Sequence, residues 1–573
     1  MARKIILICL LLLTAKLCPA QSYQWITGGG SSENMVYGYD YENVTSMITD
    51  PHGNVYITAT VGATNIKADT FYEALAHNTF HPQSHVLFAS YKCDGTMRWA
   101  KLLECSDGTD MVSQSNGTGN GSLAYSNGNI YLAGAFHGAT KYIGYDTTFT
   151  NAQSSFTARF DTSGHLKWIR FVGPDVDSTL IKTGWPGVVA IDGQGYIHNF
   201  NDMYPGVQLT STYTEDTNGT YDLKYDSTGN LVSAKRVNID SVWVIAKVQF
   251  NQWDGKYYAQ LLPNGSYWTT YRSNYCSAIG AFNPNGTLSW IDSTSIYGWI
   301  NSFDYKGGNS IYVCGFANGI DTFKLGGKAA TDTLWPSLYN IAVVCRLDTN
   351  GVARWIYNLQ SNQAADMFSD ITILSNNRVA SIGYGGTTSI HGADSLIIPW
   401  NIGDPMFLIV DSSGHTVKLD RLHADNLDNF GTTIASDAGG NVYIGGEVTD
   451  TIFAAGLSAY HSNGGNTDFF LAKYGYNDCD SLLTLGTSVQ SHSGILQSGN
   501  ILVYPNPATG LITITNATES KVQLFNTMGQ KVYSANIDND KMEVNISTLL
   551  PGTYLVLITD IFGNCTNKTI IKE

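Results

Sequence analysis

One pattern of residues recurs seven times along the chain, as DPHGNVYITA (50–59), SNGNIYLAG (126–134), DGQGYIHNF (192–200), WDGKYYAQL (253–261), GGNSIYVCG (307–315), SNNRVASIG (375–383) and AGGNVYIGG (438–446). In each copy a short turn, acidic or containing Gly or Asn, precedes a hydrophobic stretch. Turn residues followed by β-branched and aromatic residues are typical of a strand entered through a tight turn. Internal similarity of this kind predicts a repeat architecture.

A second segment follows each of these strands. It contains another strand, a turn ending in Gly and often a Trp four residues later, as FASYKCDGTMRW (88–99), FTARFDTSGHLKW (156–168), YDLKYDSTGNLVS (221–233), SAIGAFNPNGTLSW (277–290), AVVCRLDTNGVARW (342–355) and MFLIVDSSGHTVK (406–418). The seventh copy, FFLAKYGYN (469–477), stops before its last strand. With the apolar stretch before the first turn, such as Thr45 to Asp50, each complete copy predicts four strands.

The predicted fold is all-β, with a seven-bladed β-propeller over residues 21–476. A single four-stranded sheet cannot bury its two faces, and radial packing of such sheets as about four to eight propeller blades solves this problem. Near the N-terminus, Gln24-Trp25-Ile26-Thr27 matches Trp168-Ile169-Arg170 and Trp355-Ile356-Tyr357 and is an additional fourth strand. We expect it to pair near Phe470, to complete the seventh blade and to close the ring, because open edges favour aggregation.

The repeat resembles the bacterial β-propeller repeat often called the SBBP repeat. The resemblance rests on the elements D-x-x-G-N-x-Y-x-x-G and D-x-x-G-x-x-x-W and covers roughly residues 24–476. Blade three lacks the Trp, and so does blade six, where Val417-Lys418 stands instead. The resemblance implies the architecture and little about the chemistry.

The first 20 residues are predicted to be a secretory signal peptide. Arg3 and Lys4 precede an apolar run over 5–13, and Cys18-Pro19-Ala20 offers small residues for cleavage between Ala20 and Gln21. The run is too short for a permanent membrane helix, and no integral membrane segment is expected elsewhere. Lipoprotein processing at Cys18 is the alternative, although Leu17 is bulky for that processing site.

Composition and charge exclude several classes of partner. A net charge of −15 disfavours nucleic acid and anionic membrane surfaces, which attract clustered Lys and Arg. Gly (58 residues) and Tyr (34) are abundant and only 14% of residues are charged, as expected for many short strands joined by tight turns. We therefore expect an acidic protein that is soluble outside the cell.

The C-terminal region changes character. Residues 477–498 are rich in Ser, Thr and Gly and are predicted to be a linker. Residues 499–573 contain ILVYPNPATGLITI (501–514), KVQLFNTMGQKVY (521–533), EVNISTLLPGTYLVLI (543–558) and TNKTIIKE (566–573). Their alternating apolar residues and turn signals predict a small, immunoglobulin-like β-sandwich.

This block is similar to the C-terminal sorting domain (type A) of proteins exported by the type IX secretion system of Bacteroidetes. The matching residues, in the family's order, are Tyr504, Pro505, Asn506, Pro507, Gly529, Pro551, Gly552, Tyr554 and Lys572. The resemblance implies the secretion machinery as a partner, passage across the outer membrane, and then removal of the block with release or surface tethering of the remainder. A binding module of immunoglobulin type is the alternative.

Seven cysteines follow the signal segment, without any C-x-x-C pair, so no zinc site is expected and at least one thiol is unpaired within the chain. Cys314 and Cys345 lie on neighbouring predicted strands. Two buried thiols are favoured there, with a disulfide as the alternative.

No linear catalytic motif is present, and neither a cofactor nor a metal is expected. The recurring Asp and Gly residues, such as Asp161 and Gly164, fit turns better than metal ligands. His77, His81 and His85 are spaced like ligands on a helix, but Pro82 disrupts that helix and His85 is expected to enter a strand. Exposed loop histidines are the preferred interpretation.

Aromatic residues outside the repeat pattern are the candidate ligand-binding residues. Trp99, Trp168, Trp290 and Trp355 recur in equivalent places and are predicted to pack between sheets. Loop positions are instead expected for Trp185, Trp243, Trp268, Trp299, Trp335 and Trp400, together with Tyr204, Tyr267 and Tyr271.

These observations favour an exported propeller that binds a glycan or a protein without chemistry. A polysaccharide-active enzyme with carboxylates gathered at the central channel is one alternative, because such sites assemble from dispersed residues. A structural scaffold for surface assembly is the other.

Overall fold

A computed structural model of the chain describes a large part of its residues. The described residues are 21–32, 42–62, 64–75, 85–105, 123–136, 140–144, 147–150, 155–172, 187–203, 208–210, 213–214, 219–239, 243–251, 256–263, 276–295, 297–318, 322–331, 340–361, 366–375, 377–386, 388–392, 394–398, 403–425, 429–454, 456–464, 467–476, 502–515, 520–526, 531–537, 541–560 and 565–573.

Every strand or helix assigned in these ranges is a β-strand, and the all-β prediction is confirmed. Within the same ranges, no helix has the length and apolarity needed to cross a membrane. The chain divides into two compact units, residues 1–482 and 483–573. The division falls in the predicted linker 477–498, which lies outside the described residues, as does the predicted signal segment 1–20.

Seven antiparallel sheets of the first unit contain four strands each in meander order, and three of them are extended by hairpins. Sheet 1 is β2 (Val44–Thr49), β3 (Val55–Val61), β6 (His85–Tyr91) and β7 (Met97–Cys105); sheet 2 is β8 (Leu123–Ser126), β9 (Asn129–Ala135), β12 (Ser155–Asp161) and β13 (Leu166–Val172); sheet 3 is β14 (Val188–Ile191), β15 (Ile197–Met203), β18 (Gly219–Tyr225) and β19 (Leu231–Arg236); sheet 4 is β20 (Trp243–Phe250), β21 (Tyr257–Pro263), β22 (Ala278–Phe282) and β23 (Leu288–Ser293); sheet 5 is β24 (Gly298–Asp304), β25 (Ile311–Asn318), β28 (Asn340–Leu347) and β29 (Ala353–Ser361); sheet 6 is β30 (Met367–Ile373), β31 (Val379–Gly385), β34 (Asp404–Val410) and β35 (Thr416–Arg421).

Sheet 7 takes its fourth strand from the other end of the sequence. It contains β37 (Phe430–Ser436), β38 (Val442–Val448), β41 (Asp468–Gly475) and β1 (Ser22–Gly30). Strand β1 runs antiparallel to β41, with Trp25 opposite Lys473 and Gly28 opposite Phe470. The predicted pairing of the N-terminal strand with the last repeat is confirmed.

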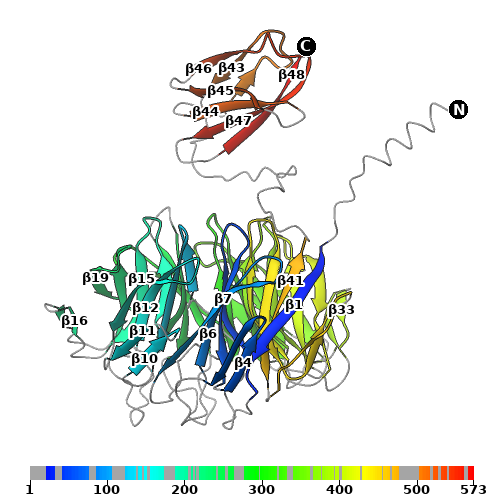
Figure 1. The fold of residues 1–573 in the computed structure, drawn as a ribbon. Coiled ribbons are helices and arrows are strands. Elements are labelled where there is room, and N and C mark those ends of the chain that lie inside the picture. Colours follow the sequence, from blue (N-terminus) through cyan, green and yellow to red (C-terminus); the bar gives the residue numbers. More distant parts are fainter. Residues whose placement is uncertain are drawn as a thin grey trace. The chain divides into compact units, whose positions relative to one another are not determined.

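Each sheet shares a hydrophobic core with the next, including sheet 7 with sheet 1. At that last junction Tyr443 and Phe469 pack with Val55 and Leu87, and six further clusters fill the other junctions in chain order. The first strand of each sheet also contacts the first strand of the next, and β37 contacts β2. Figure 1 shows these sheets standing side by side. The faces that one sheet could not bury alone are covered by its two neighbours.

The recurring Trp residues join one sheet to the turn of the next. The indole Nε1–H of Trp99 in sheet 1 donates to the carbonyl of Thr162 in sheet 2 at 3.0 Å, and Trp25, Trp168, Trp290 and Trp355 make the equivalent bond at 2.8–3.1 Å. The turn glycine beneath the ring, such as Gly164 with φ +81°, has no space for a Cβ, which would lie 2.8 Å from Trp99. The predicted packing role of these Trp residues is confirmed.

The recurring Asp residues close turns. Asp161 Oδ1 accepts from the backbone N–H groups of Ser163 and His165, both at 2.9 Å, and Asp348 and Asp411 do the same in their turns. Metal-ligand clusters of three or more His, Cys, Asp or Glu are absent from the described part of the chain. The turn interpretation of these residues is confirmed.

Hairpins inserted between the second and third strands lie against neighbouring sheets. Strand β4 pairs with β1, β10 with β7 and β32 with β29, so the hairpin of one repeat extends the outer edge of the preceding sheet. Covering an edge strand protects it from pairing with other chains. The short strands are β4 (Thr64–Ala68), β5 (Phe71–Leu75), β10 (Thr140–Ile143), β11 (Thr147–Thr150), β16 (Gln208–Thr210), β17 (Tyr213–Thr214), β26 (Phe323–Leu325), β27 (Lys328–Ala330), β32 (Ser389–His391), β33 (Asp394–Leu396), β36 (His423–Ala424), β39 (Thr451–Phe453) and β40 (Tyr460–His461).

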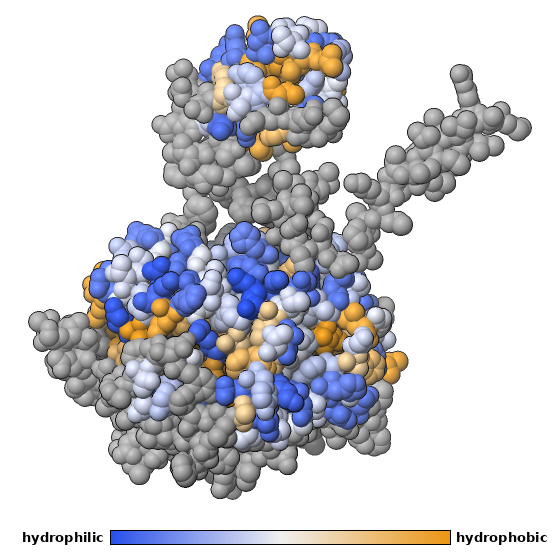
Figure 2. Space-filling model, viewed as in Figure 1, coloured by the Kyte–Doolittle hydropathy of each residue, from blue (hydrophilic) through white to orange (hydrophobic). Residues whose placement is uncertain are grey.

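The second unit contains two antiparallel sheets that share one core. The strands are β42 (Leu502–Tyr504), β43 (Leu511–Thr515) and β46 (Lys541–Asn545) in one sheet, and β45 (Lys531–Ile537), β44 (Ser520–Phe525), β47 (Gly552–Asp560) and β48 (Cys565–Lys572) in the other. Inward residues such as Ile512 and Val556 are fully buried. Large apolar residues are also exposed on this unit, as Figure 2 shows, among them Leu511 and Leu550.

Candidate functional site

The first strands of five sheets carry a β-bulge at the same position. The extra residues, which have no partner on the second strand, are Thr45, Ala246, Asn301, Ser369 and Thr432. A bulge disrupts the ladder locally and re-aims the neighbouring side chains. Here it leaves carbonyl groups that accept bonds from the preceding sheet: Asn301 Nδ2 donates to Phe368 O at 2.8 Å, and Gln260 Nε2 donates to Ile300 O at 2.8 Å.

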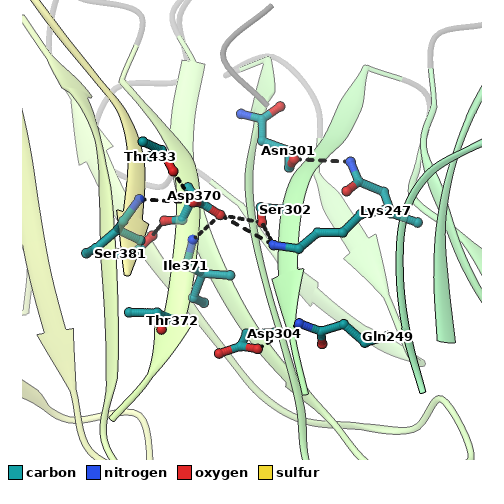
Figure 3. Close-up of polar contacts among 12 residues, drawn as sticks. Lys247, Gln249, Asn301, Ser302, Asp304, Asp370, Ile371, Thr372, Ser381 and Thr433 are labelled. Atoms are coloured by element: carbon teal, nitrogen blue, oxygen red, sulfur yellow. Dashed lines mark hydrogen bonds and ion pairs between the residues drawn. The ribbon is translucent and has the colours of Figure 1, made fainter. Parts of the chain in front are cut away.

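The residue after each bulge places a polar side chain between sheets 4, 5, 6 and 7. Lys247, Ser302, Asp370 and Thr433 occupy this position, and Figure 3 shows them meeting around Asp370. Lys247 Nζ lies 2.9 Å from Ser302 Oγ and 3.6 Å from Asp370 Oδ1. Ser302 Oγ donates to Asp370 Oδ1 at 2.6 Å, and Thr433 Oγ1 donates to Asp370 Oδ2 at 3.1 Å. We call these four residues the inner polar cluster.

A second polar layer lies two residues farther along the same strands. Gln249 Nε2 donates to Asp304 Oδ1 at 2.9 Å, and the N–H of Ile373 donates to Asp304 Oδ2 at 2.7 Å. Lys306 Nζ then reaches the carbonyl of Ile373 at 2.6 Å and Ser436 Oγ at 3.0 Å. The same four sheets are therefore linked twice.

The inner polar cluster has little capacity for chemistry on a substrate. Besides Ser302 and Thr433, the carboxylate of Asp370 accepts the N–H groups of Ile371 at 2.9 Å and Ile434 at 3.0 Å. A carboxylate offers about four lone-pair positions, and these donors fill them. The side chain of Asp370 is 4% exposed. This arrangement holds sheets together; it does not present a general acid or base.

A second polar cluster lies in sheet 3 around His198. Its Nδ1 is 2.8 Å from Asp222 Oδ1 and its Nε2 is 3.2 Å from Asp192 Oδ2, which also pairs with Lys224 Nζ at 2.9 Å. Burial lowers the pKa of His198, but the hydrogen bonds to Asp192 and Asp222 outweigh it and the pKa is raised. Equivalent positions in five other repeats hold Tyr, as at Tyr443, whose hydroxyl bonds the turn carboxylate of Asp437 at 3.0 Å, and the sixth repeat has Ala380 there. His198 is thus a variant of the repeat's turn anchor.

Most of the sequence-predicted aromatic residues cannot be placed. Trp185, Trp268, Trp335 and Trp400, with Tyr204, Tyr267 and Tyr271, lie outside the described residues. Trp243 begins β20, and its side chain lies outside the part of the structure that is described. Trp299 in β24 is half-buried and stacks on Phe316 with ring centroids 6.2 Å apart.

The histidine and cysteine predictions are partly resolved. His77 and His81 lie outside the described residues, whereas His85 begins β6 as expected and is 3% exposed, so the exposed-loop interpretation is wrong for this residue. Cys314 and Cys345 are free buried thiols on β25 and β28, and the disulfide alternative is wrong because adjacent register positions point to opposite faces. Cys93 is disulfide-bonded.

The sorting-motif residues fix the ends of the second unit. Asn506 Nδ2 donates to Thr569 O and Asn506 Oδ1 accepts the N–H of Ile571, both at 2.8 Å. Pro505 and Pro507 flank this residue, after the half-exposed Tyr504. Strand β47 begins at Gly552, directly after Pro551.

Two further residues of the motif, Tyr554 and Lys572, lie towards its C-terminal end and are buried. The hydroxyl of Tyr554 donates to Leu550 O at 2.8 Å, and Lys572 is 7% exposed. Gly529 lies outside the described residues, between the paired strands β44 and β45.

Comparison with known families identifies this unit. Residues 502–572 match the secretion system C-terminal sorting domain. The C-terminal unit is a secretion sorting domain. This match agrees with the resemblance to type IX sorting domains and indicates export to the cell surface or secretion. A comparison with curated proteins found no match.

Three solved structures are similar to the chain at low scores. They are PorZ, an essential bacterial surface component of the type IX secretion system of Porphyromonas gingivalis (10% identity, 92% of this chain and 81% of that chain, TM-score 0.29); a protein of unknown function from Dyadobacter fermentans (10%, 78% and 99%, TM-score 0.34); and polysaccharide lyase Uly1 (9%, 80% and 99%, TM-score 0.37). TM-scores below 0.5 do not establish a common fold, and no function follows from them.

Proposed function

We propose that the chain is an exported, seven-bladed β-propeller of SBBP type that binds a glycan or a protein at the cell surface or in the medium. The propeller is supported by seven meander sheets of four strands, by a shared core at every junction including that of sheets 7 and 1, and by the contacts between successive first strands. In this proposal residues 21–476 are the working domain.

The remaining segments serve export. Residues 1–20 act as the signal peptide, with cleavage between Ala20 and Gln21, and 477–498 act as the linker. Residues 499–573 form an immunoglobulin-like β-sandwich that the type IX secretion machinery recognises, supported by the family match over 502–572 and by two sheets around one core. Removal of this unit would leave the propeller released or tethered at the surface.

The observation that carries the binding role is the chain position of the six candidate Trp residues. In a meander, the connections from second to third strand and from fourth strand to the next sheet leave from the same end, which we call the loop end. Trp268, Trp335 and Trp400 belong to connections of the first kind and Trp185 to one of the second, while Trp243 and Trp299 stand at the loop ends of β20 and β24. Aromatic residues gathered at one end of a propeller suit a ligand that stacks on rings.

The test is a glycan and polysaccharide binding array with the full chain, followed by analysis of products. Retention of a specific glycan without cleavage supports the proposal, and Trp299→Ala then weakens retention. Trp355→Ala is the matched control, because Trp355 packs on the turn glycine Gly414. We expect this variant to retain the glycan while lowering stability.

Two other outcomes would replace the proposal. New reducing ends in the product analysis would identify a polysaccharide-active enzyme. Binding neither to glycans nor to proteins of the cell surface would favour a structural scaffold.

A further inference from the structure

Two buried carboxyl groups meet at the junction where the N-terminal strand completes sheet 7. Glu42 lies two residues before β2 of sheet 1, and Asp468 is the first residue of β41 in sheet 7. Glu42 is 1% exposed and Asp468 is fully buried. A Cβ on Gly30, the last residue of β1, would collide with Asp468 Oδ1 and with Glu42 Oε2, so these two oxygens converge on the glycine.

Hydrogen-bond donors surround Glu42 more completely than Asp468. Glu42 Oε1 accepts the hydroxyl of Ser31 at 2.5 Å and the N–H of Gly62 at 2.6 Å, while Oε2 accepts the N–H of Ser31 at 2.7 Å. Asp468 Oδ2 accepts the N–H of Asn463 and, at 3.5 Å, the hydroxyl of Tyr460. Asp468 Oδ1 has no donor among the described residues.

Oδ1 of Asp468 and Oε2 of Glu42 thus converge in a site where both carboxyl groups are buried. Two ionised carboxylates only accept hydrogen bonds and repel each other, so the two oxygens can bond only if one of the groups carries a proton. With one proton, the junction would hold one carboxylic acid beside one carboxylate.

The other junctions show that this pairing is special to sheets 7 and 1. At the junction of sheets 5 and 6, Asp366 is the equivalent of Glu42, because it also lies three residues before the bulge. Asp366 bonds Ser361 and the N–H of Gly386. The position that corresponds to Asp468 is occupied there by the apolar residue Ile341. At the junction of sheets 6 and 7, Asp404 takes the place of Asp468 and pairs with Arg421, and the neutral Asn429 stands for Glu42. Two acids without a base occur only where the chain closes, among the junctions that the described residues allow us to compare.

No cation compensates this pair within the described residues. Among the described residues, Glu42 and Asp468 contact no Lys, Arg or His, and Gly28 stands in the position of Arg421. The titratable residues on the neighbouring strands include Tyr23 on β1, Lys67 on β4, His85 and Tyr91 on β6, Tyr443 and Glu447 on β38, Tyr460 and His461 on β40, and Lys473 on β41 itself.

We propose that the Glu42–Asp468 pair is a proton-dependent latch, which holds β1 in sheet 7 while the pair shares a proton and loosens this junction when both groups ionise. The latch rests on the observed pairing of β1 with β41 and is independent of any ligand. Two like charges buried together repel each other, and two ionised carboxylates cannot bond to each other.

The pH range over which the latch loosens follows from the direction of the pKa shifts of Glu42 and Asp468. Burial, then the neighbouring Asp468 charge, raises the pKa of Glu42 to about 8, and burial raises the pKa of Asp468 to about 7. A carboxyl group with a raised pKa binds its proton more tightly in the folded than in the unfolded chain. Its contribution is fully present below the ordinary carboxyl pKa of about 4 and is lost as pH rises from there through the raised values of about 7 and 8.

Hydrogen exchange of the full chain, read by mass spectrometry on peptides covering Ser22–Gly30, tests the latch. Protection is expressed relative to the intrinsic exchange rate at each pH, from pH 6 to pH 9. We expect the protection of β1 in the wild type to fall by about tenfold or more across this range, because one pKa unit corresponds to about a tenfold change in the equilibrium. Glu42→Gln removes the charge and keeps a side chain of similar size whose amide can donate to Asp468, so β1 protection in this variant stays constant.

Two further variants make the result specific. Asp468→Asn repeats the test from the other side and gives a readout if Glu42→Gln does not fold. Asp366→Asn changes the equivalent acid of another junction and should leave the pH dependence of β1 as in the wild type. Constant β1 protection in the wild type, or an unchanged pH dependence in Glu42→Gln, would overturn the proposal. A fall in β1 protection on addition of EDTA at constant pH would also overturn it, since a metal ion would then occupy the site.

Discussion

The replacement of Trp25 by Ala measures how strongly the N-terminal strand is held. Its Nε1–H donates to Cys93 O at 2.8 Å, and its ring lies over Gly95 of sheet 1. A net hydrogen bond contributes about 1 kcal/mol, and a half-buried indole adds roughly 2 kcal/mol of apolar burial. We expect Trp25→Ala to lower the free energy of unfolding of the first unit by about 3 kcal/mol and Trp25→Phe by about 1 kcal/mol.

Urea unfolding of the full chain, followed by tryptophan fluorescence and circular dichroism, gives these differences. Trp99→Ala is the matched control, since Trp99 makes the same contacts with Thr162 and Gly164 at the junction of sheets 1 and 2. Equal decreases in the free energy of unfolding in Trp25→Ala and Trp99→Ala would show that the junction of sheets 7 and 1 is as well formed as that of sheets 1 and 2. A lower unfolding midpoint in Trp99→Ala together with an unchanged midpoint in Trp25→Ala would contradict the packing of the N-terminal strand on sheet 1.

Three further changes test the internal contacts. Asp370→Asn leaves Lys247, whose side chain is 13% exposed, without its counter-ion and should cost about 3 kcal/mol in urea unfolding, with part recovered in Lys247→Met/Asp370→Asn. Full stability in the single variant would contradict the ion pair. Gly164→Ala should cost more than the roughly 1–2 kcal/mol of left-handed strain alone, because the Cβ meets Trp99, whereas Gly195→Ala, with a similar φ and open space, should show only the strain; equal costs would argue against the packing. His198 has a raised pKa, so its contribution to stability is present below its ordinary value of about 6.5 and is lost as pH rises through the raised value. His198→Tyr, which introduces the residue of five other repeats, should reduce that loss of stability between pH 6 and pH 9, and an identical loss in both proteins would count against this role of His198.

Much of the first unit could be predicted because its signals are local and repeated. The turn Asp and Gly residues and the Trp four residues after each Gly mark the strands, and the spare Trp25 segment identifies the partner of the incomplete last repeat. The missing Trp of blade six also has a physical reason. Each Trp packs on the turn between third and fourth strands of the next sheet, and sheet 7 has no such turn because β1 comes from the other end of the sequence.

The inner polar cluster could not be predicted from the repeat pattern. A Lys or Asp inside an apolar strand has no visible partner in the sequence, because Lys247 and Asp370 are brought together only by packing of sheets 4 to 6. Each bulge shifts the strand register by one residue, so the alternation of apolar and polar residues along these first strands is interrupted before the cluster positions. One signal was available: Lys247, Asp370 and Thr433 each stand four positions before the first residue of the following turn.

The inserted hairpins and the Glu42–Asp468 contact were missed for a similar reason. The hairpins are short, and their partners are strands of the preceding sheet, so only the folded structure shows that they cover edges. Glu42 and Asp468 are far apart in sequence and meet because β1 joins β41.

The most direct test of the account is a disulfide across the proposed closure. Thr27 and Leu471 are opposite each other in β1 and β41, while Gly475 lies about 13 Å farther along the strand. The account predicts that Thr27→Cys/Leu471→Cys forms the bond under mild oxidation, detected by mass spectrometry as linked peptides, and that Thr27→Cys/Gly475→Cys does not. Linked peptides in the second variant, or none in the first while the protein remains folded, would contradict the closure of the last sheet by the N-terminal strand.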